Sequence, residues 1–332
     1  MPDASELAAQ VLVGDLRSAS RLISLLERED ERAADAVAEL FPSTGSARAI
    51  GITGPPGAGK STLIKQFIDA YRERGLRVGV LAIDPSSQRT GGALLGDRLR
   101  MVSHTMQEGV FIRSMAVRDQ QGGIALSTTQ AMRVLDALGC DRLIVETVGV
   151  GQSEIAVAST VDCTVLVSHP GAGDEIQAMK SGIMEIGDLY VINKADQPGA
   201  EHLRRQLRSA VRMLAAKDPP RQVYMVSART GDGVAELVEA VETRLERLEA
   251  SGTLGRQRLL NLQQEVVQLI VSRSVAKALS ELGPNPVATY LTDLDQRRLD
   301  PSTVASLVLG EQPENRSLAE PSVVEGGTEG AA

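Results

Sequence analysis

The fold of this chain is decided by one stretch, which reads Gly54-Pro55-Pro56-Gly57-Ala58-Gly59-Lys60-Ser61. The stretch matches the pattern GxxxxGK(S/T) in full and stands between a predicted strand at residues 50–53 and a predicted helix. Such loops turn their backbone N–H groups around the phosphates of a nucleotide, and the following helix directs its positive end at the same anion. A glycine-rich turn that binds nothing is the alternative, but the flanking strand and helix favour a phosphate-binding loop.

The residues at the end of this stretch have distinct expected roles. The Lys60 ammonium would lie between the β and γ phosphates of a nucleoside triphosphate, and the Ser61 hydroxyl is the expected ligand of Mg²⁺. Thr62 comes next and can reach the α-phosphate. Residues 54–62 are therefore a candidate site for phosphate and magnesium, with Lys60 as a candidate catalytic residue.

Short apolar runs alternate with amphipathic helical segments from residue 48 to about residue 250. This alternation is typical of βαβ units, and largely apolar strands are expected where helices cover both faces of a sheet. The pattern predicts an α/β fold of the P-loop NTPase type with a mostly parallel sheet. The predicted strands are residues 50–53, 78–83, 143–145, 165–167, 189–192 and 223–226.

Two motifs beyond the phosphate loop indicate which base is bound. The first follows the strand at residues 189–192 and reads Asn193-Lys194-Ala195-Asp196. The Asp196 carboxylate can accept from both N1–H and N2–H₂ of guanine, whereas adenine would leave this carboxylate unpaired, a loss that can discriminate by roughly 10⁴. The second motif follows the last strand, places the Ala228 N–H near O6 of the base, and reads Ser227-Ala228-Arg229. Three motifs in this order, each at the carboxyl end of a strand, predict a GTP site.

The segment that senses magnesium and the γ-phosphate departs from the usual DxxG pattern. Here it reads Glu146-Thr147-Val148-Gly149. Glu146 can still hold a magnesium-bound water, and the Gly149 N–H can meet the γ-phosphate. Val150 follows, so the glutamine that orients the attacking water in Ras-type enzymes is missing and slow intrinsic turnover is expected. Gln152 is near in sequence, but it can equally be a polar loop residue.

Two further acids stand in loops that can reach the phosphates. Asp84 closes the strand at residues 78–83, and we assign it to water positioning or to the magnesium shell. Asp97 lies in a glycine-rich loop, and we assign it to magnesium in an activated state. Loop aspartates also serve as caps or turn residues, and this alternative stays open for both.

The segments outside the nucleotide-binding domain are helical or polar. We predict an N-terminal helical segment at residues 1–46, a P-loop GTPase domain at 47–250, C-terminal helices at 251–310 and a disordered tail at 311–332. The C-terminal helices carry apolar residues on too many sides to be free in water. They must pack on their own domain or on another copy of the chain.

Bulk composition excludes several classes of function. The net charge of −8 argues against a nucleic-acid partner or an anionic membrane, since both require a basic face. Cys140 and Cys163 are too few for a disulfide framework, which fits a reducing compartment. The sequence shows neither a signal-peptide pattern nor an apolar run of membrane-spanning length, so we expect a cytoplasmic protein.

Several stretches together closely resemble one family. They are GITGPPGAGKSTLI, LAIDPSSQRTGGALLGDRLRM, LIVETVGVGQSE, HPGAGDEIQAMKSGI, NKAD and SAR. The resemblance is to the methylmalonyl-CoA mutase-associated GTPases, the MeaB family, which includes the mitochondrial MMAA proteins and proteins labelled ArgK. It runs from about Leu7 through Leu309.

This resemblance implies more than the motifs do. It implies a homodimer that uses the C-terminal helices as its dimerisation arm, and a GTP-dependent chaperone of an adenosylcobalamin-dependent acyl-CoA mutase such as methylmalonyl-CoA mutase. Such a chaperone gates delivery of the cofactor and protects or reactivates the mutase. The resemblance also implies a third switch loop with four candidate residues, Asp174, Glu175, Gln177 and Lys180. A capped helix N-terminus is the alternative for that loop.

Two other functions remain as alternatives. A nickel metallochaperone GTPase would share the P-loop and the dimer, but the sequence has no His-rich tract and no Cys-His pair at ligand spacing. A nucleotide-dependent kinase is suggested by the ArgK label, but most such kinases use ATP, against which Asp196 argues.

Overall fold

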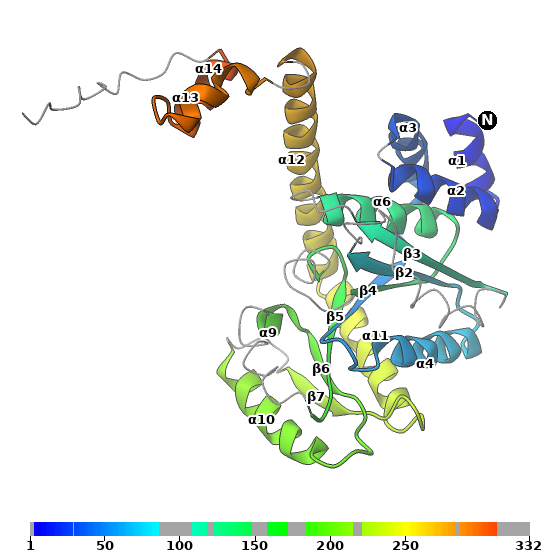
Figure 1. Cartoon of the computed structure of the whole chain (residues 1–332). Coiled ribbons are helices and arrows are strands. Elements are labelled where there is room, and N and C mark those ends of the chain that lie inside the picture. The colour runs from blue at the N-terminus through cyan, green and yellow to red at the C-terminus, as the bar shows by residue number, and fades with distance from the viewer. Residues whose placement is uncertain are drawn as a thin grey trace, which may run out of the picture. The chain divides into compact units, whose positions relative to one another are not determined.

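The computed structural model describes residues 3–28, 30–85, 108–117, 123–147, 158–171, 183–214, 221–282 and 286–310. The chain divides into two compact units, residues 1–265 and 266–332. A single sheet of seven strands organises the first unit, with the order β3-β2-β4-β1-β5-β6-β7 and every neighbouring pair parallel (Figure 1). The strands are β1 (Arg48–Thr53), β2 (Val78–Pro85), β3 (Val110–Val117), β4 (Arg142–Thr147), β5 (Cys163–Ser168), β6 (Leu189–Ile192) and β7 (Gln222–Met225). The predicted α/β class with a parallel sheet is confirmed.

Helices cover both faces of this sheet, which explains why its central strands are apolar throughout. One face packs against α4 (Lys60–Glu73) and α11 (Val234–Ala250), around Phe67, Tyr71 and Leu237. The other face packs against α6 (Gly123–Ala137), the short α9 (Ile183–Ile186) and α10 (Ala200–Met213). Because all strands run in one direction, their carboxyl ends share one edge. The loop after β1, residue Asn193 after β6 and residue Ser227 shortly after β7 all lie at this edge.

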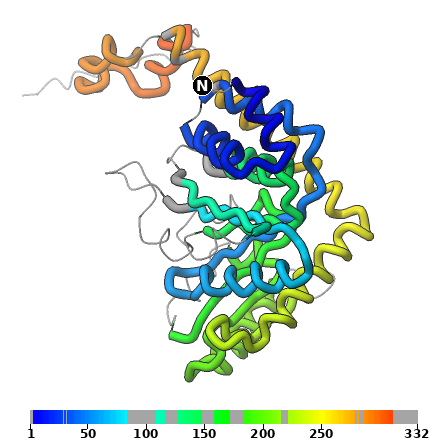
Figure 2. The backbone as a smooth tube through the Cα atoms, turned by 90° about the vertical axis from the view of Figure 1, so that its right-hand side faces the viewer, coloured from blue at the N-terminus to red at the C-terminus, as the bar shows by residue number. Residues whose placement is uncertain are grey.

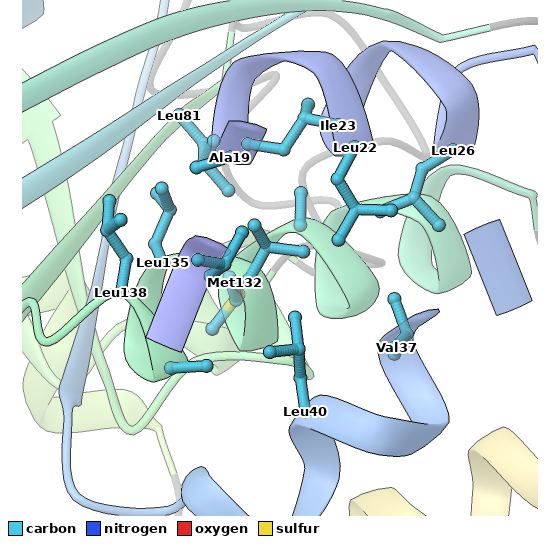
Figure 3. Close-up of a cluster of buried hydrophobic side chains, with 14 of the residues drawn as sticks. Ala19, Leu22, Ile23, Leu26, Val37, Leu40, Leu81, Met132, Leu135 and Leu138 are labelled. Carbon is cyan, nitrogen blue, oxygen red and sulfur yellow. The ribbon is translucent and has the colours of Figure 1, made fainter. Parts of the chain in front are cut away.

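Three N-terminal helices complete the second face. They are α1 (Ala4–Leu12), α2 (Leu16–Leu26) and α3 (Glu31–Leu40), followed by a turn of 3₁₀ helix, η1 (Phe41–Ser43). Leu22 and Ile23 of α2 and Leu40 of α3 are fully buried in one cluster with Leu135 of α6 and Leu81 of β2 (Figure 3). Burying each such side chain stabilises the fold by about 1.5–3 kcal/mol. These helices and α4 lie on opposite sides of the sheet (Figure 2).

Strand β3 is the outermost strand on one side of the sheet, and it was not predicted from the sequence. Its middle carries Arg113, a residue that interrupts the apolar pattern. The Arg113 guanidinium donates to Ser24 Oγ of α2 at 2.7 Å and to Oε2 of Glu27, the C-cap residue of α2, at 2.6 Å. A polar residue is tolerated in this strand because the N-terminal helices supply its partners.

The long helix α12 (Thr253–Leu282) begins in the first unit and is anchored there by an arginine. Arg258 donates from Nε and Nη2 to the two carboxylate oxygens of Asp162, at 2.9 and 2.6 Å, and from Nη1 and Nη2 to the carbonyls of Gly45 and Ala47. Asp162 is buried, so removing its partner would cost about 3–5 kcal/mol. Glu265 makes a second anchor through an ion pair with Arg133 of α6.

The second unit contains the rest of α12, a 3₁₀ turn η2 (Ala288–Tyr290), α13 (Leu291–Asp295) and α14 (Pro301–Val308). Asp300 caps α14 by accepting from the backbone N–H groups of Ser302 and Thr303. None of the helices in the described part of the chain is long and apolar enough to span a membrane. The predicted tail at residues 311–332 lies outside the described residues.

Candidate nucleotide site

The phosphate loop connects β1 to α4 and is tied to the base motif by one side chain. Asn193, the first residue after β6, donates from Nδ2 to the carbonyl of Ala58 at 2.8 Å and accepts at Oδ1 from the N–H of Ala228 at 3.0 Å. Gly59 has a φ of 83°, and a Cβ there would lie 2.5 Å from Asn193 Nδ2. Glycine is therefore required at this position for the loop and the base motif to approach each other.

The end of the phosphate loop brings together the residues predicted for phosphate and magnesium. Lys60 is buried, and its ammonium donates to the carbonyls of Gly54 at 2.6 Å and Pro55 at 3.0 Å. The Ser61 hydroxyl donates to Glu146 Oε1 at 2.9 Å. Glu146 is the next-to-last residue of β4 and only 7% exposed. Residues 85 positions apart in the sequence thus meet at the first turn of α4.

This pair of oxygen donors fits a magnesium ion. Mg²⁺ prefers hard oxygen ligands and retains several waters, so one hydroxyl and one carboxylate suffice on the protein side. Ser61 would hold the ion, and Glu146 would hold it or one of its waters. In the described part of the chain, no group of three or more His, Cys, Asp or Glu side chains could hold a metal ion.

The base motif presents a carboxylate that is held on both oxygens. Asp196 Oδ1 accepts from the Ser227 hydroxyl at 2.7 Å, and Oδ2 accepts from Arg229 Nη2 at 2.9 Å. The hydrogen bond from Arg229 makes the largest contribution, and together with the bond from Ser227 it lowers the pKa of Asp196 to about 2. Asp196 is ionised at neutral pH with or without this shift, so what the two hydrogen bonds add is a fixed orientation of the carboxylate. Lys194 has a φ of 57°, one of two non-glycine residues with positive φ in the described part of the chain.

Two contacts at this edge were not predicted from the sequence. Gln66 of α4 donates from Nε2 to the carbonyl of Ala228 at 3.2 Å, and the Thr147 hydroxyl donates to Thr53 Oγ1 at 2.8 Å. The first joins the phosphate helix to the base motif, and the second joins β4 to β1 directly below the phosphate loop. Gln66 stands in no recognisable motif, and Thr147 lies in the sensor segment without a role assigned to its hydroxyl. In both contacts the partner is more than ninety positions away.

The remaining predicted residues divide into two groups. Asp84 is placed near the end of β2, at the same edge of the sheet, where its backbone pairs with Ala116. Thr62 is the third residue of α4 and exposed. The rest of the predicted site residues lie outside the described residues: Asp97, Gly149, Asp174, Glu175, Gln177 and Lys180.

Comparisons with known proteins agree with this geometry. The family model for the methylmalonyl-CoA mutase-associated GTPase MeaB matches residues 19–282. A putative GTPase of Pyrococcus abyssi is 42% identical, over 92% of this chain and 96% of that protein. The GTPase ArgK of Escherichia coli is 38% identical, over 74% of this chain and 75% of that protein.

A solved structure shares the fold. The crystal structure of an LAO/AO transport system kinase has a TM-score of 0.66 and 29% identity, covering 92% of this chain and 96% of that one. The family model covers most of the chain, and the phosphate loop, the Ser61–Glu146 pair and the base motif lie together at one edge of the sheet. The chain belongs to the family of methylmalonyl-CoA mutase-associated GTPases.

Proposed function

We propose that this protein binds GTP with Mg²⁺ and hydrolyses it to GDP and phosphate. The observation that carries the proposal is the contact between Ser61 and Glu146 at the first turn of α4, beside a buried Lys60. This arrangement brings a magnesium-binding hydroxyl, an acid and a phosphate-binding cation to one point. The names of the relatives as GTPases support the same activity.

Each residue of the site contributes in its own way to phosphoryl transfer. The backbone of the phosphate loop and the start of α4 bind the β-phosphate, and Lys60 stabilises the negative charge that develops between the β and γ phosphates. The magnesium ion neutralises phosphate charge when it is bound. Asp196 orients the base, and Asn193 keeps the base motif in register with the phosphate loop. Val150 stands where other GTPases place the glutamine that orients water, so turnover by the isolated protein is slow.

Replacing Lys60 tests the chemical proposal. Lys60→Ala removes the charge between the phosphates, and we expect hydrolysis to fall by at least about 100-fold, or roughly 3 kcal/mol of transition-state stabilisation. The matched control is Lys65→Ala, because Lys65 lies exposed on the same helix. Both variants should keep the circular dichroism spectrum of the parent protein. Normal GTP turnover by Lys60→Ala would show that hydrolysis does not take place at the phosphate loop.

We further propose that GTP binding and hydrolysis serve an adenosylcobalamin-dependent acyl-CoA mutase, whose cofactor loading this protein gates and whose activity it protects or restores. The family to which the chain belongs supports this proposal, since it is described as mutase-associated. A client that holds the loops around the γ-phosphate in their catalytic arrangement would compensate for the missing glutamine. If the mutase binds the GTP and GDP forms differently, it must shift the ratio of the two nucleotide affinities by the same factor.

A variant in the proposed third switch tests this coupling. Methylmalonyl-CoA mutase should accelerate GTP hydrolysis by the wild-type protein, because a bound client would hold the catalytic loops in their productive arrangement. Lys180→Ala should keep near-normal GTP affinity, because Lys180 lies outside the phosphate loop and the base motif, but lose most of this stimulation and of the control over cobalamin transfer. Lys65→Ala again serves as the control. Equal stimulation of Lys180→Ala and wild type would contradict the switch assignment, and no stimulation of the wild type by any adenosylcobalamin mutase would contradict the chaperone proposal.

A further inference from the structure

A cavity lies at the edge of the sheet where the strands begin, opposite the nucleotide motifs. Its volume is about 560 Å³, within the range of small-molecule sites. It opens where β2 and β3 begin and α4 ends, and its lining includes Leu16, Arg72, Arg77, Glu108, Phe111 and Leu138. The nucleotide motifs stand at the carboxyl ends of the strands, so a ligand in this amino-edge cavity would not compete with GTP.

Two arginines give the amino-edge cavity a positive character. Arg72, in the last turn of α4, donates from Nη1 to the carbonyl of Leu76 at 2.7 Å, and its buried Nε has no acceptor in the described part of the chain. Arg77 lies against Gly139, where a Cβ would stand 2.8 Å from Nη1. The charged lining residues are Arg72, Arg77 and Glu108, so their net charge is +1, in a chain whose net charge is −8.

The other side chains that line the cavity are apolar or unreactive. Val110, Phe111 and Leu138 are buried lining residues, and Leu16 is a half-exposed one. Cys140 also lines the cavity, but burial raises the pKa of its thiol to about 12, so it remains protonated. The cavity therefore offers charge and apolar contact rather than a nucleophile.

We propose that the amino-edge cavity binds a small amphiphilic anion, with its carboxylate or phosphate head on Arg77 and Arg72 and a short aliphatic body against Leu16 and Phe111. Guanidinium groups bind both kinds of head group in bidentate fashion, and the apolar wall excludes a fully hydrated ion as the preferred ligand. The inference does not depend on the proposed GTPase activity, because it uses none of the residues of the nucleotide site.

The test is a calorimetric titration of the full-length protein with three probes that share a four-carbon body: butyrate, butyl phosphate and butanol. Saturating GDP and Mg²⁺ are present throughout, so that butyl phosphate does not bind at the phosphate loop. We expect saturable binding of at least one anion and no comparable binding of butanol. The anion that binds more tightly identifies the preferred head group, carboxylate or phosphate.

Two variants locate the binding. Arg77→Gln removes the charge and should weaken the anion about tenfold or more, as expected for the loss of a charged hydrogen bond. Leu16→Asp places a negative charge on a half-exposed lining residue and should weaken anion binding similarly without disturbing the core. The matched control is Arg74→Gln, since Arg74 belongs to the same segment but pairs with Glu239 and does not line the cavity. Absence of saturable anion binding, or equal affinity in all three variants and the wild type, would overturn the proposal.

Discussion

At the scale of single residues, Asp196 shows how a recognition group is prepared by its neighbours. The motif indicates that Asp196 recognises guanine, and Ser227 and Arg229 orient its carboxylate by donating to its two oxygens. The pair with Arg229 is exposed, so it contributes little to stability. Together with the Ser227 hydroxyl, Arg229 lowers the pKa of Asp196 and fixes the direction of its two oxygens.

This pKa is open to direct measurement. Its depression from 3.8 to about 2 means that the carboxylate stays ionised until the pH falls through about 2. Any stabilisation from these hydrogen bonds is then present above pH 3.8 and lost as the pH approaches 2. In a carboxyl ¹³C NMR titration, Arg229→Ala should move the midpoint of Asp196 upward, toward 3.8, while Arg229→Lys should restore part of the shift. An unchanged midpoint in Arg229→Ala would show that Arg229 does not hold the carboxylate.

The sequence predicts some of these residues better than others. Lys60, Ser61 and Asp196 stand in short motifs whose spacing itself indicates the chemistry, and the Ser61 hydroxyl donates to Glu146, the other predicted magnesium residue. Gln66 could not be predicted, because it is an ordinary polar residue on a helix until β7 and the segment after it bring Ala228 within reach. A side chain whose role depends only on a distant partner leaves no local signal.

At the scale of elements, periodicity predicted the central strands and the helices α10 and α11, because their apolar positions repeat without interruption. The edge strand β3 was missed, since half-buried positions and Arg113 blur its pattern. The helix α12 carries a different signal, because apolar residues remain exposed along it. We propose that a second copy of the chain covers them. The exposed apolar residues of α12 are Leu259, Leu260, Val266, Val267, Ile270, Val271 and Val275.

Charges on this helix test the proposed dimer. The double variant Val267→Asp with Val271→Asp puts two carboxylates among the exposed apolar residues of α12, where burial in an interface would be costly. Sedimentation velocity should give about twice the 35.2 kDa chain mass for the wild type and the chain mass for this variant. The control, Gln268→Asp with Ser272→Asp, adds the same charges at exposed polar positions and should remain dimeric. A dimeric valine variant, or a monomeric wild type, would exclude this helix as the dimer interface.

At the scale of the whole molecule, one parallel sheet gathers residues from distant parts of the chain. Lys60 comes from the start of α4, Glu146 from the end of β4, and Asn193 and Asp196 from the connection after β6. They lie at one edge because parallel strands share their direction. The α/β fold class could be predicted from the order of the motifs along the sequence. The helical N-terminal segment was also predicted and is confirmed. Its packing on the sheet and the anchors of α12 could not be predicted, because they depend on contacts such as that of Arg258 with Asp162.

The central claim is that this edge selects a guanine nucleotide, and one substitution tests it in the full-length protein. Asp196→Asn replaces one acceptor by a donor that faces the N–H groups of guanine, whereas xanthine offers an acceptor at the same place. Equilibrium binding of GTP and xanthosine triphosphate to both proteins, with Mg²⁺, should show a loss of GTP affinity of at least about 100-fold in Asp196→Asn and a gain for xanthosine triphosphate. Equal GTP affinity in the variant and the wild type would contradict the account.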